Sequence, residues 1–246
     1  MNLTKLFGIH SVQAALDYSA NKIHKVWVDS QRQDKRLSVL IKQLQDSGLM
    51  VEKSDRKRLD KMTDGQNHQG IVVEVEIPGV HSESELKHIV NTMDDVPFFL
   101  VLDQVQDPHN IGACLRTADA AGVHGIIITK DNSVGITPAV CKVACGAAET
   151  VPVYQVTNLA RTLRWLKEQN IWLIGATGDT SESIFAADLK IPLALVMGTE
   201  ATGMRRLTEQ LCDFLVKIPM VGQVESLNVS VAAGVMIYEV FKQRML

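Results

Sequence analysis

Polar side chains that could do chemistry gather in three segments of the sequence after Pro97. Asn110 and Arg116 lie in "DPHNIGACLRTADAAG", and Glu200 lies between two glycines in "GTEATGMR". The third segment, "VGQVESLNV", places Ser226 and Asn228 directly before a long apolar run. Serine and asparagine are good helix caps, but one helix needs only one cap. We interpret the excess of polar groups as a binding site at a helix N-terminus, where backbone N–H groups point outward.

Each of these residues also has a plainer interpretation when it is taken alone. Asn110 can cap a helix that carries Arg116 in its second turn, and Glu200 can form a surface ion pair. The glycines beside Glu200, however, would let a backbone approach a ligand closely. Together, the three ordered segments favour a functional site over a set of caps.

The elements that must position these groups are alternating strands and helices from Pro97 onward. The strands, among them "FFLVLD", "GIIIT" and "LALVMG", are continuous apolar runs, which is typical of a parallel sheet buried on both faces. Thr137 followed by Pro138 predicts the start of one helix over "TPAVCKVACGAAE". Ligands of open α/β sheets bind beyond the carboxyl ends of the strands, so we expect the three polar segments to meet there.

The first 77 residues read as a smaller α/β unit. Its predicted helices are "AALDYS" and "KRLSVLIKQLQDSG", the second ending at Gly48, and its predicted strands are "KVWVD", "MVEKS" and "GIVVEVEI". The basic segment Lys53 to Lys61 is either a solvated helix or a local patch for nucleic acid. We predict three regions: a substrate-binding domain over residues 1–77, a linker with one short helix over 78–96, and a catalytic domain over 97–246.

The composition of the chain limits the classes of protein to which it can belong. The chain has 246 residues, of which 46% are hydrophobic and 22% charged, and a net charge of −3, so nucleic-acid binding would depend on local patches. No apolar run approaches the roughly 18 residues that span a bilayer, and we expect a cytoplasmic protein without membrane contact. The four cysteines lack the paired spacing of a zinc site, so we interpret them as small buried apolar residues and expect no metal.

Three motifs in order identify a family. "DPHNIGACLRTADAAG", "LVMGTEATGM" and "IPMVGQVESLNVSVAAGVMIYE" resemble the motifs of the SpoU, or TrmH, family of RNA ribose 2′-O-methyltransferases that depend on S-adenosyl-L-methionine. "FGIHSVQAAL" and "HQGIVVEVE" resemble the substrate-binding domain of the subgroup that methylates a guanosine in bacterial 23S ribosomal RNA (rRNA). The resemblance therefore covers nearly the whole chain.

The resemblance implies an α/β fold with a C-terminal SPOUT-type domain. That domain would hold a mainly parallel sheet and a trefoil knot, although chain knots are rare in general. It would follow a small α/β RNA-binding domain of the L30e-like type, and the enzyme would be a homodimer through its catalytic domain. Backbone near Gly198, Ile218 and Leu227 would hold the cofactor. The family's catalytic positions correspond to Asn110, Arg116, Glu200, Ser226 and Asn228.

The chemistry of such a site can be argued from its groups. Methyl transfer from a sulfonium needs alignment and help for the ribose hydroxyl to lose its proton, and it requires no metal. A guanidinium stays protonated and suits phosphate, so we expect Arg116 to grip a phosphate and stabilise the developing alkoxide. Glu200 and Asn110 would orient one another or Arg116. Ser226 and Asn228 would bond the nucleotide or tie the loops together.

Other functions remain open at this point. A nicotinamide-dependent oxidoreductase is disfavoured, because "IGATGDT" lacks the GxGxxG spacing at the start of a helix. Methylation of transfer RNA (tRNA) and non-catalytic RNA binding on the same fold are the stronger alternatives.

We also expect a bulky side chain at Gly198 to occupy the adenosine's place and to weaken cofactor binding without loss of the fold.

Overall fold

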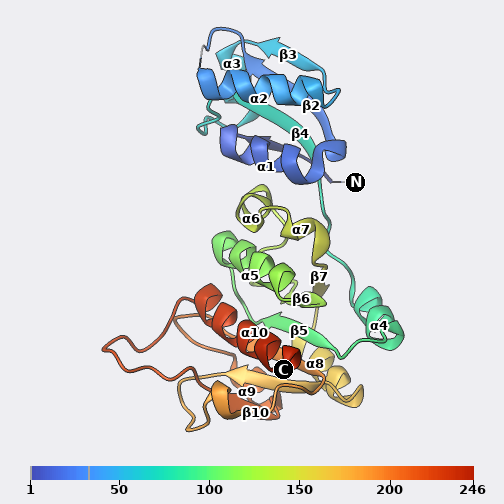
Figure 1. The fold of residues 1–246 in the computed structure, drawn as a ribbon, viewed down its shortest axis with the longest axis vertical. Coiled ribbons are helices and arrows are strands. Elements are labelled where there is room, and N and C mark those ends of the chain that lie inside the picture. Colours follow the sequence, from blue (N-terminus) through green and yellow to red (C-terminus); the bar gives the residue numbers. More distant parts are fainter. Residues whose placement is uncertain (1, 33) are drawn as a thin grey trace. The chain divides into compact units, whose positions relative to one another are not determined.

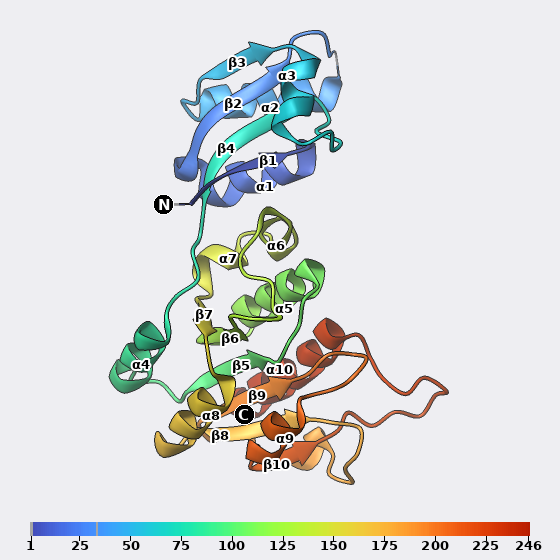
Figure 2. The same cartoon turned by 180° about the vertical axis from the view of Figure 1, so that it is seen from behind.

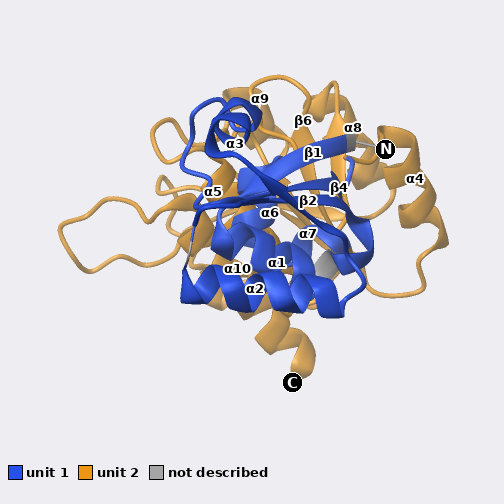
Figure 3. Ribbon diagram, turned by 90° about the horizontal axis from the view of Figure 1, so that it is seen from above, with its two compact units in different colours: residues 1–79, 136–149 blue, residues 80–135, 150–246 orange. Residues whose placement is uncertain are grey.

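The computed structural model describes residues 2–32 and 34–246. The chain forms two compact units, coloured separately in Figure 3. Unit 1 comprises the residues up to Gly79 together with 136–149, and unit 2 comprises residues 80–135 and 150–246. A segment from the middle of the sequence thus belongs to the N-terminal unit.

Unit 1 is a four-stranded mixed sheet covered by helices. The strand order is β1 (Asn2–Phe7), β4 (Ile71–Ile77), β2 (Ile23–Asp29) and β3 (Val51–Ser54), with only the β2–β3 pair parallel. The helices are α1 (Ile9–Ser19), the short η1 (Ala20–Lys22), α2 (Lys35–Asp46) and α3 (Arg56–Met62). Leucine and valine side chains of α1 and α2 pack on one face, whereas Leu59 of α3 packs with Trp27 and Val72 on the other. The predicted elements of this region are confirmed, and β1 is an additional strand.

The helix ends of unit 1 follow from local chemistry. Asp34 caps α2 by accepting from the backbone N–H groups of Arg36 and Leu37, and Gly48, with φ of 82°, follows the helix C-terminus. Asp55 caps α3 in the same way, so the basic segment is a helix that starts directly after β3. Its cations are consequently exposed beside the carboxyl ends of β2 and β3.

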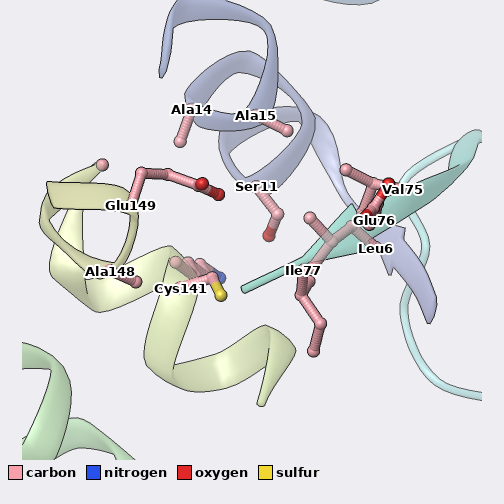
Figure 4. A pocket seen from close by; sticks show the side chains of 12 residues that line it. Leu6, Ser11, Ala14, Ala15, Val75, Glu76, Ile77, Cys141, Ala148 and Glu149 are labelled. Atoms are coloured by element: carbon pink, nitrogen blue, oxygen red, sulfur yellow. The ribbon is translucent and has the colours of Figure 1, made fainter. Parts of the chain in front are cut away.

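Residues 138–150 hold two helices rather than the single one predicted. Thr137 caps α6 (Pro138–Ala144), as expected, but Cys145 has φ of 51° and Gly146 has φ of 97°, so the chain turns before α7 (Ala147–Thr150). The segment packs against α1 and β4 around a cavity of about 40 Å³, shown in Figure 4, and Glu149 pairs with Lys22. Ligand pockets usually hold about 300 Å³ or more, so this cavity is a packing gap.

Unit 2 is built on a six-stranded parallel sheet. The strand order is β10 (Phe214–Val216), β8 (Trp172–Ala176), β9 (Leu193–Met197), β5 (Phe98–Leu102), β6 (Gly125–Thr129) and β7 (Val153–Val156). Helices α5 (Pro108–Ala120) and α10 (Val229–Met245) lie side by side on one face, and α4 (Glu83–Thr92), α8 (Leu159–Glu168) and α9 (Arg206–Leu211) lie on the other, as Figures 1 and 2 show. A short helix, η2 (Ile184–Ala186), precedes β9.

The order of these strands sets the position of the site. Strands β5, β6 and β7 are neighbours in the order of the sequence. The later strand β9 pairs with the opposite edge of β5. The order therefore reverses between β5 and β9, where open α/β sheets bind ligands at the strands' carboxyl ends. The prediction of an α/β fold with a mainly parallel sheet is confirmed.

The predicted linker, residues 78–96, holds the helix α4. Ser82 and Glu85 form a reciprocal capping box at its start. Leu86 is fully buried in the core of unit 2 with Phe99 and Leu163. Part of the segment therefore packs on the sheet of unit 2.

Of the four cysteines, Cys114 is buried, whereas Cys141, Cys145 and Cys212 are only partly buried. Burial raises the pKa of the Cys114 and Cys212 thiols to about 12 and that of Cys141 to about 11, so these thiols stay protonated at neutral pH. Across the described part of the chain, no three His, Cys, Asp or Glu side chains group as a metal site would need. Within the same residues, no helix has the length and apolar character to cross a membrane.

Candidate active site

The segments that follow β5, β9 and β10 meet at the carboxyl edge of the unit 2 sheet. Glu200 Oε1 accepts from the Asn110 side-chain amide at 3.5 Å, from the Val229 backbone N–H at 3.2 Å and from the Asn228 amide. The Asn228 amide also donates to Asn110 Oδ1 at 3.0 Å. Three of the five predicted catalytic residues thus form one hydrogen-bonded cluster that ties the three motifs together.

Asn110 is available for this cluster because it does not cap its helix. Asp107 caps α5 by accepting from the His109 backbone N–H, and Pro108 opens the first turn. The capping role considered for Asn110 is therefore wrong. Asn228, by contrast, is a true cap: it accepts from the Ser230 backbone N–H at 3.0 Å and still donates to Glu200.

A tight turn presents Glu200. The Thr199 and Gly203 backbones exchange hydrogen bonds of 3.0 and 2.9 Å, which closes the loop between them. Gly198, just before the turn, lies so close to the returning chain that an added Cβ would be 2.0 Å from the Gly203 carbonyl carbon and 2.1 Å from the Met204 nitrogen. Gly198 is therefore a glycine because the chain crosses itself there. A bulky side chain would meet this backbone first, so a substitution here would have to displace the returning chain before it reached the pocket.

An ion pair that sequence reasoning missed anchors the end of this turn. Asp103, at the end of β5, is buried, and its carboxylate accepts from the Arg205 guanidinium at 2.8 Å and from the Arg205 backbone N–H at 3.0 Å. A buried carboxylate needs such partners. The pair fixes residue 205 to the neighbouring strand and thereby holds the 198–205 segment in place.

We expect Asp103→Asn to destabilise the protein by about 2 kcal/mol, because it removes a charge-assisted hydrogen bond and turns an amide N–H toward a donor. Chemical denaturation measures this change, and calorimetry should show weaker cofactor binding. Arg161→Gln is the control. It breaks the Arg161–Glu83 ion pair, in which the arginine side chain is 61% exposed, and exposed ion pairs contribute little to stability. Equal stability of the two variants would contradict an anchoring role for Asp103.

Beside the cluster lies an open pocket of about 800 Å³ at the ends of β8, β9 and β10. The predicted site residues in its wall are Gly198, Glu200, Ile218, Ser226 and Leu227. One side is formed by the connection from β10 to α10, whose outer part, residues 219–226, is exposed and extends away from the unit in Figure 1. The pocket therefore brings together all three predicted cofactor positions.

Arg116, Asn110 and Asn228 lie outside the pocket wall. Asn110 and Asn228 border it through Glu200, whereas Arg116 is exposed on α5, two turns after Pro108. Lining residues that sequence reasoning missed are Thr177, Gly178, Asp179, Glu209 and Lys217. "IGATGDT" was a usable signal for the first three, because its glycine and polar residues directly follow a predicted strand.

The pocket suits the cofactor that the resemblance implies. Its volume lies within the usual range for small-molecule sites, about 300–1,000 Å³. Asp179, Glu200, Glu209 and Glu225 contribute carboxylates to the wall, against one cation, Lys217. This excess of negative charge complements a sulfonium and an ammonium group.

Comparisons with known proteins agree with this geometry. A sequence model of the "SpoU rRNA Methylase family" matches residues 97–238, and a model for "RNA 2′-O ribose methyltransferase substrate binding" matches residues 5–79. The chain is 51% identical to a 23S rRNA (guanosine-2′-O-)-methyltransferase RlmB of Shewanella oneidensis, over 97% of both chains. It is 47% identical to the Escherichia coli protein of the same name, over 97% of this chain and 98% of that one.

Among solved structures, the SpoU methyltransferase AviRb of Streptomyces viridochromogenes, determined with the cofactor AdoMet, superposes with a TM-score of 0.74. The identity is 24%, and the match covers 98% of this chain and 90% of that one. An RNA 2′-O ribose methyltransferase of 25% identity superposes with a TM-score of 0.73, over 99% of this chain and 90% of that one. Both share the fold of both units.

Proposed function

The chain belongs to the SpoU family of rRNA methylases, and we propose that it transfers a methyl group from S-adenosylmethionine to the ribose 2′-hydroxyl of one guanosine in 23S rRNA. The observation that carries this proposal is the alignment of both RlmB relatives along nearly the whole chain, including the substrate-binding unit. The fold is that of SPOUT methyltransferases, and the trefoil knot is implied by that fold.

S-adenosylmethionine, when bound, supplies a methyl group already activated as a sulfonium for in-line displacement. We propose that backbone at Gly198, Ile218 and Leu227 holds its adenosine end. Their shared place in the pocket wall supports this role. The protein must then exclude water and keep the ribose hydroxyl aligned with the methyl carbon.

The Glu200 cluster would provide that alignment. Since Glu200 accepts from both α5 and α10, it locks the first and third motifs at a fixed spacing around the pocket. We propose that Ser226 bonds the target nucleotide from the loop before α10. We propose that Arg116 grips the neighbouring phosphate and stabilises negative charge as the hydroxyl reacts, because a guanidinium matches phosphate geometry.

The N-terminal and C-terminal parts of the chain would have different roles. We propose that residues 1–77 form the RNA substrate-binding domain, that 78–96 form a linker, and that 97–246 form the catalytic domain. The substrate-binding model over residues 5–79 and the methylase model over 97–238 support this division. Because ribosomal RNA is the proposed substrate, we also propose a cytoplasmic location.

Methyl transfer to transcribed 23S rRNA tests the function directly. The purified protein is incubated with labelled S-adenosylmethionine and either 23S rRNA or tRNA, and 2′-O-methylation is then mapped in the product. We expect a single modified guanosine in 23S rRNA and none in tRNA. Transfer to tRNA alone would overturn the substrate assignment, and cofactor binding without any transfer would favour a non-catalytic RNA-binding protein.

We further propose that the enzyme is a homodimer through α10. Val231, Tyr238 and Met245 lie two turns apart on this helix and are 52%, 48% and 71% exposed, so they form an apolar stripe along one face. The Tyr238 and Phe241 rings also contact each other, with centroids 5.8 Å apart. An exposed apolar stripe of this kind is typical of a subunit interface.

We expect Tyr238→Asp to convert the dimer to a monomer, because a charge would be buried in an apolar interface. Sedimentation equilibrium measures the change. Val39→Asp is the matched control: Val39 is also an exposed apolar residue of a helix, 53% exposed on α2. A dimer that survives Tyr238→Asp, or a wild-type monomer at all concentrations, would contradict the proposal.

A further inference from the structure

Unit 1 contains a polar hollow that no part of the proposed mechanism uses. It has a volume of about 760 Å³ and lies where β2 and β3 end, between the start of α3 and residues 65–70 before β4. Its donors include Arg32, Arg56 and Lys57 and the amides of Gln66 and Asn67. The hollow is thus in the size range of a small-molecule site but is lined by polar groups.

The wall of this hollow is rigid on the side before β4. His68 is buried; its Nδ1 accepts from the Gly70 backbone N–H at 3.0 Å, so its Nε2 carries the proton and donates to Asp60 at 3.1 Å. Gln69 Oε1 accepts from the Ile9 backbone N–H at 2.9 Å. These bonds fix the backbone and leave the Gln66 side chain at the exposed rim.

The carboxylates of the hollow already have partners of their own. Asp29 accepts from the Gln31 backbone, Asp55 from the Arg58 backbone and Asp60 from His68. Each of these bonds uses one carboxylate oxygen, so the second oxygen of each group can still accept a hydrogen bond. The hollow therefore offers acceptors beside its donors, as the edge of a nucleobase requires.

One cation of the hollow, Arg32, is held in place by contacts within the protein, whereas Arg56 and Lys57 are not held in this way by the described residues. Arg32 bonds Asp34 at 2.9 Å, and its side chain lies over Gly70, where an added Cβ would be 2.6 Å from Arg32 Cδ. Within residues 2–32 and 34–246, the Arg56 and Lys57 side chains have no ion-pair or hydrogen-bond partner. These two cations are therefore ready to bind an anion without losing an internal contact.

We propose that this hollow binds one unpaired nucleotide of the RNA substrate. Arg56 and Lys57 hold its phosphate, the Arg32 guanidinium stacks on its base, and the amides of Gln66 and Asn67 bond the base edge. Unpaired bases are recognised in this way, by stacking on guanidinium planes and by hydrogen bonds to their edges. The choice of RNA as the ligand rests on the proposed function, whereas the geometry of the hollow does not.

Binding of the full chain to transcribed 23S rRNA, measured by filter binding over a range of salt concentrations, tests this site. The double variant Arg56→Ala/Lys57→Ala should weaken binding about tenfold or more. The slope of the logarithm of the binding constant against the logarithm of the salt concentration should fall by the amount that one to two lost phosphate contacts produce. Gln66→Ala should weaken binding about fivefold and leave the salt dependence unchanged, since it loses a base contact. The control Lys5→Ala/Lys42→Ala removes the same charge from exposed positions of unit 1 outside the hollow.

A blunt RNA duplex of matched length separates an unpaired nucleotide from general backbone binding. Gln66→Ala should bind the duplex as tightly as wild type does. Equal binding of 23S rRNA by the hollow variants and the control would overturn the site, and so would equal losses of Gln66→Ala on both RNAs. These binding measurements need no methyl transfer. An enzyme inactive on 23S rRNA would therefore refute the proposed function without deciding the hollow.

Discussion

Replacing Gly198 with alanine is expected to raise the dissociation constant for S-adenosylmethionine at least about 100-fold, a loss of about 3 kcal/mol. The new Cβ would lie 2.0–2.2 Å from backbone atoms of Gly203 and Met204, which cannot rotate away as a side chain could. The turn that carries Glu200 must open to make room. Since that turn forms both a wall of the pocket and the link to Asn110 and Asn228, binding and catalysis should fall together.

A matched glycine on another loop of the site provides the control for this variant. Gly222, between β10 and α10, has no atom within 4 Å of its added Cβ, so Gly222→Ala makes the same chemical change in open space. Isothermal titration calorimetry compares the two variants, and far-UV circular dichroism checks that the sheet persists. A dissociation constant for Gly198→Ala within twofold of that for Gly222→Ala would show that the chain crossing is not needed for cofactor binding.

Arg116→Ala is expected to reduce the single-turnover methyl transfer rate by about 100-fold or more while leaving cofactor affinity nearly unchanged. The proposed contacts of Arg116, to a phosphate and to developing charge, exist only with RNA bound and are strongest in the transition state. Its exposed position on α5, outside the pocket wall, agrees with a role toward RNA. Arg116→Lys should recover little activity, because an ammonium keeps the charge but lacks the two-pronged geometry.

The pH dependence of Arg116→Ala separates two roles for this arginine. If Arg116 removed the proton, high pH should partly rescue the variant by raising the alkoxide fraction; if it acts on phosphate, rescue should be absent. Arg164→Ala, which removes an exposed arginine of α8 in the same unit, is the control and should transfer at the wild-type rate. Normal transfer by Arg116→Ala would eliminate both roles and leave Arg116 as a surface residue of the helix.

The sequence by itself determined most elements of the fold and the segments that meet at the site, but not β1 or the break between α6 and α7. Continuous apolar runs such as "FFLVL" and "LALVM" predicted buried parallel strands, and both are strands of the sheet. Caps such as Thr137 and glycines such as Gly48 marked helix ends correctly. These features are readable because they depend on a few neighbouring residues, whose side-chain pattern and backbone preferences act over one or two turns.

Only the tertiary structure decided how the site is held together. Asp103 and Arg205 are 102 residues apart, and Asn110 and Asn228 are 118 apart; these pairs exist because the sheet places the ends of β5, β9 and β10 at one edge. The reason that position 198 must be glycine likewise depends on a backbone that returns over it. Local periodicity carries no information about strand order or chain crossings, because these are set by long-range packing. In the Asp103–Arg205 pair, for example, the arginine satisfies a carboxylate that would otherwise be buried without a partner.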